Sequence, residues 1–301
     1  MTSPTFFSRF ARWFVSSLAI LVLAGIGVAP VHAQDESSDA DNTEELKKEL
    51  QASYQAAAEA GNQGNHGTAI DRFEEALDLA QQLELDDIVE KIQSNMTNSM
   101  KRAGSAALKE EDNEAALDYF GEALEYVEDD PSVYHNRGIA YFRMDSTDAA
   151  LESMEQAIEL GNETGNTRVA GLATERVRGH FLNIASEALN AESLSSSQIQ
   201  TALDALDEMQ EYVDPNAETM FYRALALYEQ SDYQEAIQTA QQGLDMHDGS
   251  RSDAAKFYFV VGESQMELGN EADACETFPN AAYGDYQARA EHYLENDCED
   301  L

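Results

Sequence analysis

The sequence predicts an all-α fold, an α-solenoid of stacked helix pairs, and two patterns carry this prediction. Small residues recur with a fixed spacing of 12, 4 and 3 residues, as at Gly138, Ala150, Met154 and Ala157. Polar turn signals fall inside the 12-residue interval, for example "EEDNE" (110–114) and "MDSTD" (144–148). The first small residue of each set is therefore expected on one helix and the others on the next.

This spacing recurs along most of the chain. The other full sets are Ala57, Ala69, Phe73 and Ala76; Gly104, Ala116, Phe120 and Ala123; Ala224, Ala236, Ala240 and Gly243; and Gly262, Ala274, Phe278 and Ala281. A partial set has Ala202, Leu206 and Met209, with Ala185 or Ala188 as its displaced first member. Only a small side chain fits where two helices cross closely, and the larger third residue fills the adjoining gap. Each pair leaves apolar surface uncovered, so pairs are expected to stack without one central core.

The turns divide the chain into about six helix pairs and a closing helix. The predicted pairs are 43–60 with 66–83, 86–110 with 113–128, 132–144 with 147–160, 166–190 with 196–213, 217–230 with 233–246, and 254–268 with 271–283. Pro279 should distort the last second helix. The Gly-rich stretch "GNQGNHG" follows a helix, so we interpret it as a turn and not as a phosphate loop. An amphipathic helix over 285–297 is expected as the C-terminal capping helix, because a solenoid end needs a cover.

Two segments resemble the tetratricopeptide repeat, whose unit is about 34 residues of helix, turn and helix. "YHNRGIAYFRMDSTDAALESMEQAIEL" carries Tyr134, Gly138, Tyr141, Ala150 and Ala157 at family positions. "YFVVGESQMELGNEADACETFPNAA" carries Tyr258, Gly262, Leu268, Gly269, Ala274, Phe278 and Ala281. Arg137 and Arg223 stand where the family prefers Leu. The resemblance covers 43–297 and implies a right-handed superhelix whose first helices line a concave, protein-binding face.

The N-terminal residues 1–33 are typical of a secretory signal peptide. Arg9 and Arg12 precede the apolar run "WFVSSLAILVLAGIGV", and small residues lead to a predicted cleavage after Ala33. An uncleaved membrane anchor is the alternative. Residues 34–42 are predicted to be an acidic disordered leader and 298–301 a C-terminal tail. We therefore expect a protein of the periplasm or cell exterior, without membrane insertion after cleavage.

The chain is strongly acidic, with a formal net charge of −40. This charge disfavours nucleic acid and anionic membranes as partners. The acids are spread along the chain, which favours adaptation to a halophilic medium over a dedicated cation-binding surface. The predicted first helices carry nearly balanced charge, whereas Arg72 is the one basic residue of the predicted second helices. The implied convex side is therefore acidic and the implied concave side nearly neutral.

The sequence contains no motif for catalysis, for a metal or for a cofactor, so none of these is expected. Of its two cysteines, Cys275 lies near the start of the last repeat's second helix and Cys298 lies just past the end of the closing helix. In an oxidising compartment they are predicted to form a disulfide that fastens the cap. Two buried free thiols are the alternative.

The resemblance implies contact positions on the first helices. The candidate partner-binding residues are Lys101, Arg102, Lys109, His135, Asn136, Phe142, Arg143, Phe221, Tyr222, Tyr228, Lys256 and Phe259. Lys101, Asn136 and Arg143 loosely echo the family's carboxylate clamp. The alternative is that the aromatic residues belong to the core and the basic residues neutralise nearby acids. We expect an exported, non-catalytic scaffold or adaptor, monomeric or weakly oligomeric, that binds a protein or peptide of the cell envelope. The alternatives are a self-assembling envelope protein and an enzyme of the cell wall.

Overall fold

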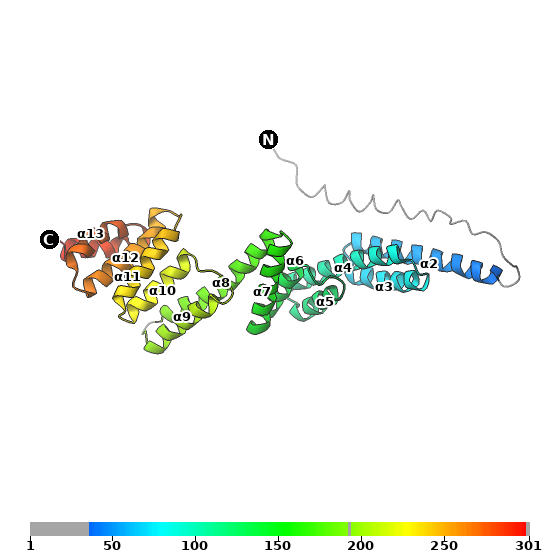
Figure 1. Cartoon of the computed structure of the whole chain (residues 1–301), viewed down its shortest axis with the longest axis horizontal. Coiled ribbons are helices and arrows are strands. Elements are labelled where there is room, and N and C mark those ends of the chain that lie inside the picture. Colours follow the sequence, from blue (N-terminus) through cyan, green and yellow to red (C-terminus); the bar gives the residue numbers. More distant parts are fainter. Residues whose placement is uncertain (1–35, 192–193, 299–301) are drawn as a thin grey trace, which may run out of the picture. The chain divides into compact units, whose positions relative to one another are not determined.

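The computed structural model describes residues 36–191 and 194–298, and in these ranges the chain is all-α, as predicted (Figure 1). The first helices of the six pairs are α2 (Glu36–Asn62), α4 (Asp86–Lys109), α6 (Pro131–Arg143), α8 (Thr167–Leu189), α10 (Ala217–Glu229) and α12 (Arg251–Glu267). The second helices are α3 (His66–Gln82), α5 (Asn113–Tyr126), α7 (Thr147–Glu163), α9 (Ser196–Met209), α11 (Tyr233–Met246) and α13 (Glu271–Ala281). A 3₁₀ turn, η2 (Gly284–Tyr286), leads into the closing helix α14 (Gln287–Asn296).

The N-terminal end of α2 differs from the sequence prediction. The helix includes residues 36–42, where we predicted a disordered leader. Such an acidic segment is favoured at a helix N-terminus, because negative charge stabilises the positive end of the helix dipole. The predicted signal peptide and the last three residues of the predicted tail lie outside the described residues. No described helix combines the length and the apolar character needed to cross a membrane.

The chain divides into two compact units, with the boundary between Ser153 and Met154. In the N-terminal unit, each helix from α2 to α6 packs against its neighbour in sequence. One cluster of buried residues runs through these helices, from Leu50 on α2 through Met96 on α4 to Ala140 on α6. Helices α4 and α6 also contact each other, so the first helices of these pairs lie in one layer.

The C-terminal unit is built by the same rule. Consecutive helices pack together from α8 to α14, and α10 contacts both α8 and α12. These three first helices therefore form a layer of their own, which we call the inner layer of the C-terminal unit. The turn η2 packs against α12, so that the closing segment continues this layer. The capping helix predicted at this end is thus present in the structure.

The recurring small residues lie where helices make their closest contacts. Every Ala of the repeated sets is fully buried. A Cβ atom built on Gly104 would lie 2.6 Å from Cε1 of Phe120, and one on Gly262 would lie 2.6 Å from Cε1 of Phe278. The third member of these sets therefore fills the space that glycine leaves open, as predicted. In the partial set, Ala185 is fully buried, which identifies it as the displaced first member.

Residues with a left-handed backbone conformation follow the first helix of several pairs. Gly64 and Gly269 have φ angles of 83° and 75°, but Glu111, Asp145 and Ser231 take the same conformation without being glycine. Pro279 lies inside α13 and does not interrupt it; the helix continues to Ala281. The proline therefore does not end the helix, although it lacks the N–H that would donate to the Cys275 carbonyl.

The closing helix is fastened to α13 by a disulfide and by aromatic packing. Cys275 and Cys298 are disulfide-bonded, with their Cα atoms 5.6 Å apart, as the sequence predicted. The Tyr293 ring stacks on Phe278 with centroids 4.4 Å apart and planes 5° from parallel. Ala290, also on α14, is fully buried. These contacts cover the apolar end of the last pair.

Candidate binding site

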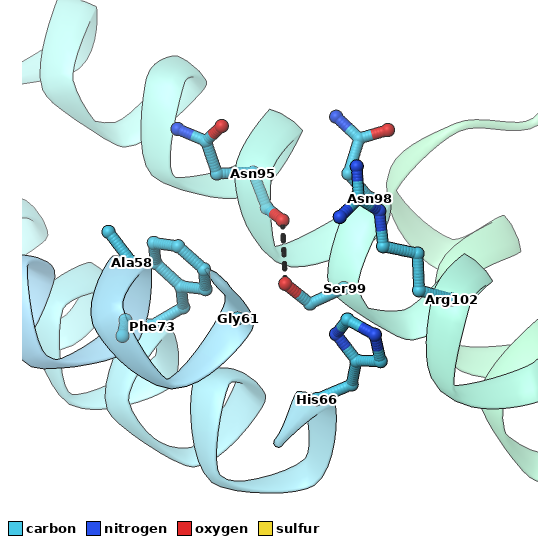
Figure 2. A pocket seen from close by; sticks show the side chains of 9 residues that line it. Ala58, Gly61, His66, Phe73, Asn95, Asn98, Ser99 and Arg102 are labelled. Atoms are coloured by element: carbon cyan, nitrogen blue, oxygen red, sulfur yellow. Dashed lines mark hydrogen bonds between the residues drawn. The ribbon is translucent and has the colours of Figure 1, made fainter. Parts of the chain in front are cut away.

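A small pocket opens between the first pair and α4 in the N-terminal unit (Figure 2). The cavity itself measures about 10 Å³, room for about one water molecule, and it opens to solvent. We call it the His66 pocket; the lining residues are Ala57, Ala58, Gly61, His66, Phe73, Asn95, Asn98, Ser99 and Arg102. The small residues of α2 leave room for the pocket, and α4 supplies most of its polar groups. His66, the first residue of α3, closes one side.

The polar side chains of α4 lie on one face of the helix because they are spaced by three, one and three residues. Asn95 is fixed, since its Nδ2 donates to Tyr54 Oη at 2.9 Å and to the Lys91 carbonyl at 3.0 Å. Ser99 Oγ donates to the Asn95 carbonyl at 3.1 Å, the bond drawn in Figure 2. Asn98 and Arg102 are exposed at the mouth. The pocket therefore has a rigid polar wall and an accessible cation at its rim.

His66 gives the pocket an unsatisfied polar atom. Its Nδ1 is buried and has no hydrogen-bond partner among the described residues. Burial, and next the positive charge of Arg102, lower the pKa of His66, so the ring is neutral at neutral pH. Figure 2 shows the ring between Ser99 and Arg102. A neutral imidazole, an amide and a guanidinium together suit a ligand with acceptor oxygens, such as a carboxylate.

Of the residues that line this pocket, only Arg102 was predicted from the sequence as a binding residue. His66 was assigned to an inter-helix turn, and the structure does place it at the end of that turn, but it also brings the ring against α4. The spacing of Asn95, Asn98 and Arg102 along a single helix face was a signal that could have pointed to the site. No group of three or more acidic, His or Cys side chains able to hold a metal ion occurs among the described residues.

Two of the predicted cationic contacts hold the N-terminal unit together. Lys101 forms an ion pair with Asp130, the residue that caps α6. Arg143, at the end of α6, donates to the carbonyl of Leu108 near the end of α4. Two of the three members of the predicted carboxylate clamp, Lys101 and Arg143, thus bind groups of this chain, which favours the alternative of a structural role for them. Lys109 is exposed in the last turn of α4.

The other candidates on α6 remain partly accessible. His135 and Asn136 are half-buried, with His135 Nδ1 and Asn136 Oδ1 3.3 Å apart. Phe142 is also half-buried. The structure does not bring these side chains into the His66 pocket.

In the C-terminal unit, two predicted aromatic contacts are core residues. Phe221 is 7% exposed and Phe259 is 1% exposed, which favours the alternative that these aromatic residues belong to the core. The face that they occupy is covered by the next helix of the stack. Lys256 lies 4.6 Å above the Phe221 ring and pairs with Glu218 at 3.4 Å. It therefore neutralises a local acid, the alternative that the sequence left open.

Two tyrosines of α10 are half-buried in the inner layer. The Tyr222 hydroxyl donates to Ser186 Oγ at 3.3 Å and joins α10 to α8. Burial, and then the negative charges of Glu263 and Glu267, raise the pKa of Tyr228. Tyr228 is therefore a neutral phenol beside the acids of α12.

A family model and one curated relative match parts of this chain. A family model described as "Tetratricopeptide repeat" matches residues 101–163, 194–251 and 221–290. The Hsp70-Hsp90 organizing protein of Triticum aestivum is 36% identical over 63 residues, which are 21% of this chain and 11% of that protein. The chain thus spans about a tenth of the length of this relative.

Two similar solved structures are also repeat proteins. A tetratricopeptide repeat protein from Parabacteroides merdae is 12% identical, with a TM-score of 0.31, over 82% of this chain and 98% of that one. YrrB, described as a TPR protein with an unusual peptide-binding site, is 19% identical, with a TM-score of 0.32, over 67% of this chain and 91% of its own.

Proposed function

Because the chain belongs to the tetratricopeptide repeat family, we propose that it is a non-catalytic adaptor that binds a protein or peptide through its first helices. The His66 pocket carries the more specific part of this proposal. Its exposed mouth, at Asn98 and Arg102, would contact an acidic group of the partner, either a C-terminal carboxylate or the side chain of an Asp or Glu. Arg102 and Asn98 would donate to the carboxylate oxygens, and His66 Nδ1 would gain the partner that it lacks.

What supports this assignment is the contrast between the pocket and the rest of the chain. In a protein with a net charge of −40, an accessible guanidinium beside donor groups is an uncommon place for an anion to dock. Asn95 and Ser99 hold their positions before a ligand arrives, so little side-chain ordering is needed on binding. The acidic surroundings would repel anions that do not reach the pocket, which adds selectivity.

We further propose that the protein acts outside the cytoplasm, with a partner in the cell envelope. The basic and apolar start of residues 1–33 supports export, and a disulfide between Cys275 and Cys298 is favoured by an oxidising compartment. N-terminal sequencing of the protein recovered from fractionated host cells tests this part. We expect Gln34 as the first residue of the exported form, and an intact Met1 in the membrane fraction would contradict it.

The binding test uses three forms of the mature chain as bait in an envelope extract. The wild type should retain a partner that an Arg102→Glu variant loses, whereas Lys109→Glu should retain it. Lys109 is a matched control because it is exposed on the same helix and lies outside the pocket. Titration of the identified partner should then give a dissociation constant at least about tenfold weaker for Arg102→Glu than for Lys109→Glu.

Two outcomes would contradict the proposal. Equal loss of the partner in both variants would point to general electrostatics and not to the pocket. Retention of the partner by Arg102→Glu would place the contact elsewhere. Circular dichroism of all three proteins ensures that a difference in binding is not a difference in folding.

A further inference from the structure

Arg289 of the closing helix lies in a site made of one carboxylate and aromatic rings. The guanidinium carbon is 4.1 Å from the centroid of the Phe259 ring and 5.9 Å from that of Tyr286. Its Nη2 lies 3.3 Å from Oε1 of Glu263. We call this set of Phe259, Glu263, Tyr286 and Tyr293 the Arg289 cage. None of its acidic or tyrosine members was identified from the sequence.

Glu263 is the anion of the cage. Its side chain is only 13% exposed, and its Oε1 accepts from both Arg289 and the Tyr293 hydroxyl, each at 3.3 Å. Burial raises the pKa of Glu263, and Arg289 only partly offsets this. Glu229 and Glu267 add negative charge nearby. The inner layer of the C-terminal unit therefore holds a poorly compensated carboxylate next to aromatic rings.

The contacts of Arg289 itself are weak. Its side chain is 60% exposed, and its bond to Glu263 is long. The closing helix does not depend on it, because the disulfide at Cys298, the stacking of Tyr293 on Phe278 and the buried Ala290 all fasten α14 independently. Moving Arg289 aside would uncover the Phe259 ring and leave Glu263 without a cation.

We propose that the cage is a docking site for an arginine side chain of a partner protein, and that Arg289 occupies it until the partner arrives. A guanidinium fits better than an ammonium ion, since its flat face stacks on an aromatic ring while its edge donates to the carboxylate. Charge favours such a partner, because the chain is acidic throughout. This inference goes beyond the adaptor proposal and uses no residue of the His66 pocket.

The test measures the binding of N-acetyl-argininamide by NMR titration of the full mature chain. Arg289→Ala empties the cage. Arg251→Ala is the matched control, because Arg251 is an exposed arginine of the same unit at the start of α12. The dissociation constant should be about tenfold lower for Arg289→Ala than for the wild type, where the tethered Arg289 competes. Arg251→Ala should bind the probe as the wild type does.

A second variant locates the site. Adding Glu263→Gln to Arg289→Ala should weaken binding of the probe about tenfold again, because the anion is lost while the rings remain. The neutral probe N-acetyl-glutaminamide should not bind any form. Equal affinity of Arg289→Ala and Arg251→Ala, or equal affinity with and without Glu263, would overturn the proposal. If Arg289→Ala unfolds, saturable shifts of the Glu263 and Tyr293 resonances in the wild type support the site, and their absence at the highest probe concentration refutes it.

Discussion

Lys101 and Asp130 form an ion pair that joins the middle of α4 to the first turn of α6. The same carboxylate accepts from the backbone N–H of Ser132 at 2.9 Å and so caps α6. The Lys101 and Asp130 side chains are 31% and 17% exposed, so solvent screens the pair only partly. A residue considered a partner contact from sequence thus fixes how two first helices lie against each other.

Removing the carboxylate should destabilise the N-terminal unit. Asp130→Ala loses both the cap and the ion pair, and we expect it to lower the free energy of unfolding by about 2 kcal/mol. Asp130→Asn keeps a capping side chain and should cost about half as much. Urea denaturation followed by circular dichroism measures both. Equal effects of the two substitutions would mean that the cap contributes nothing.

The pair also predicts a pH dependence. Burial alone would raise the pKa of Asp130, but the hydrogen bond and charge of Lys101 outweigh it and lower this pKa. The stabilisation is therefore present above the unfolded value of about 4 and is lost as the pH falls through the lower folded value. The stability difference between the wild type and Asp130→Asn should shrink steadily below about pH 4. A difference that stays constant with pH would refute this linkage.

The contribution of Glu263 to stability should depend on pH in the opposite direction. Because burial raises its pKa, the ionised carboxylate is less favourable in the folded protein, and stability falls as the pH rises through the folded value. Glu263→Gln should raise the free energy of unfolding near pH 8 by up to about 1 kcal/mol, and this gain should vanish below about pH 4. Thermal unfolding across this range measures it. A loss of stability near pH 8 would show that the Arg289 bond outweighs burial.

Two glycines of the second repeat should respond oppositely to alanine. Gly104→Ala places a Cβ 2.6 Å from Phe120, and such overpacking should cost about 1–3 kcal/mol. Gly121, one residue after Phe120, has nothing within 4 Å of its would-be Cβ, so Gly121→Ala should stabilise α5 by about 0.5–1 kcal/mol. Chemical denaturation of both variants is the measurement. Tolerance of Gly104→Ala would mean that the Phe120 ring moves aside easily.

Two turn residues with a left-handed backbone conformation offer a second matched pair of substitutions. Ser231 and Gly269 end equivalent first helices with φ angles of 71° and 75°. Ser231→Gly should raise the free energy of unfolding by about 0.5–1 kcal/mol, and Gly269→Ala should lower it by about 1 kcal/mol, since only glycine takes this conformation without strain. Melting temperatures of the two variants should shift in opposite directions. A shift in the same direction would contradict the assignment of strain.

The sequence was sufficient for the fold because the fold depends on short spacings. The interval from Gly104 to Ala116 and Phe120 indicates a contact between two helices that are consecutive in the sequence. Local turn signals indicate where each helix ends. Cys275 and Cys298 were also predictable as a pair, since antiparallel packing of consecutive helices brings their positions together.

The roles of the candidate binding residues were harder to predict, because the groups that these side chains contact lie about one repeat away in the sequence. Nothing local indicates that Lys101 meets Asp130, or that Arg143 reaches the Leu108 carbonyl. Phe259 was predicted on a surface because the family resemblance places it at a concave position, whereas packing of the closing segment buries it. His66 was not predicted because it lies in a turn of the sequence. Only the packing of α4 against α3 places its ring at the edge of a pocket.

The disulfide also affects the order in which the helices unfold. In a stack where helices mainly touch their chain neighbours, a terminal helix has the fewest contacts and frays first. The covalent bond between Cys275 and Cys298 ties down the last helix, and the two cysteines of the sequence leave none to tie down α2. Under heat or mechanical load, unfolding should therefore begin at the N-terminal end. Reduction of the disulfide should narrow this difference, because side-chain packing alone then holds the last helix.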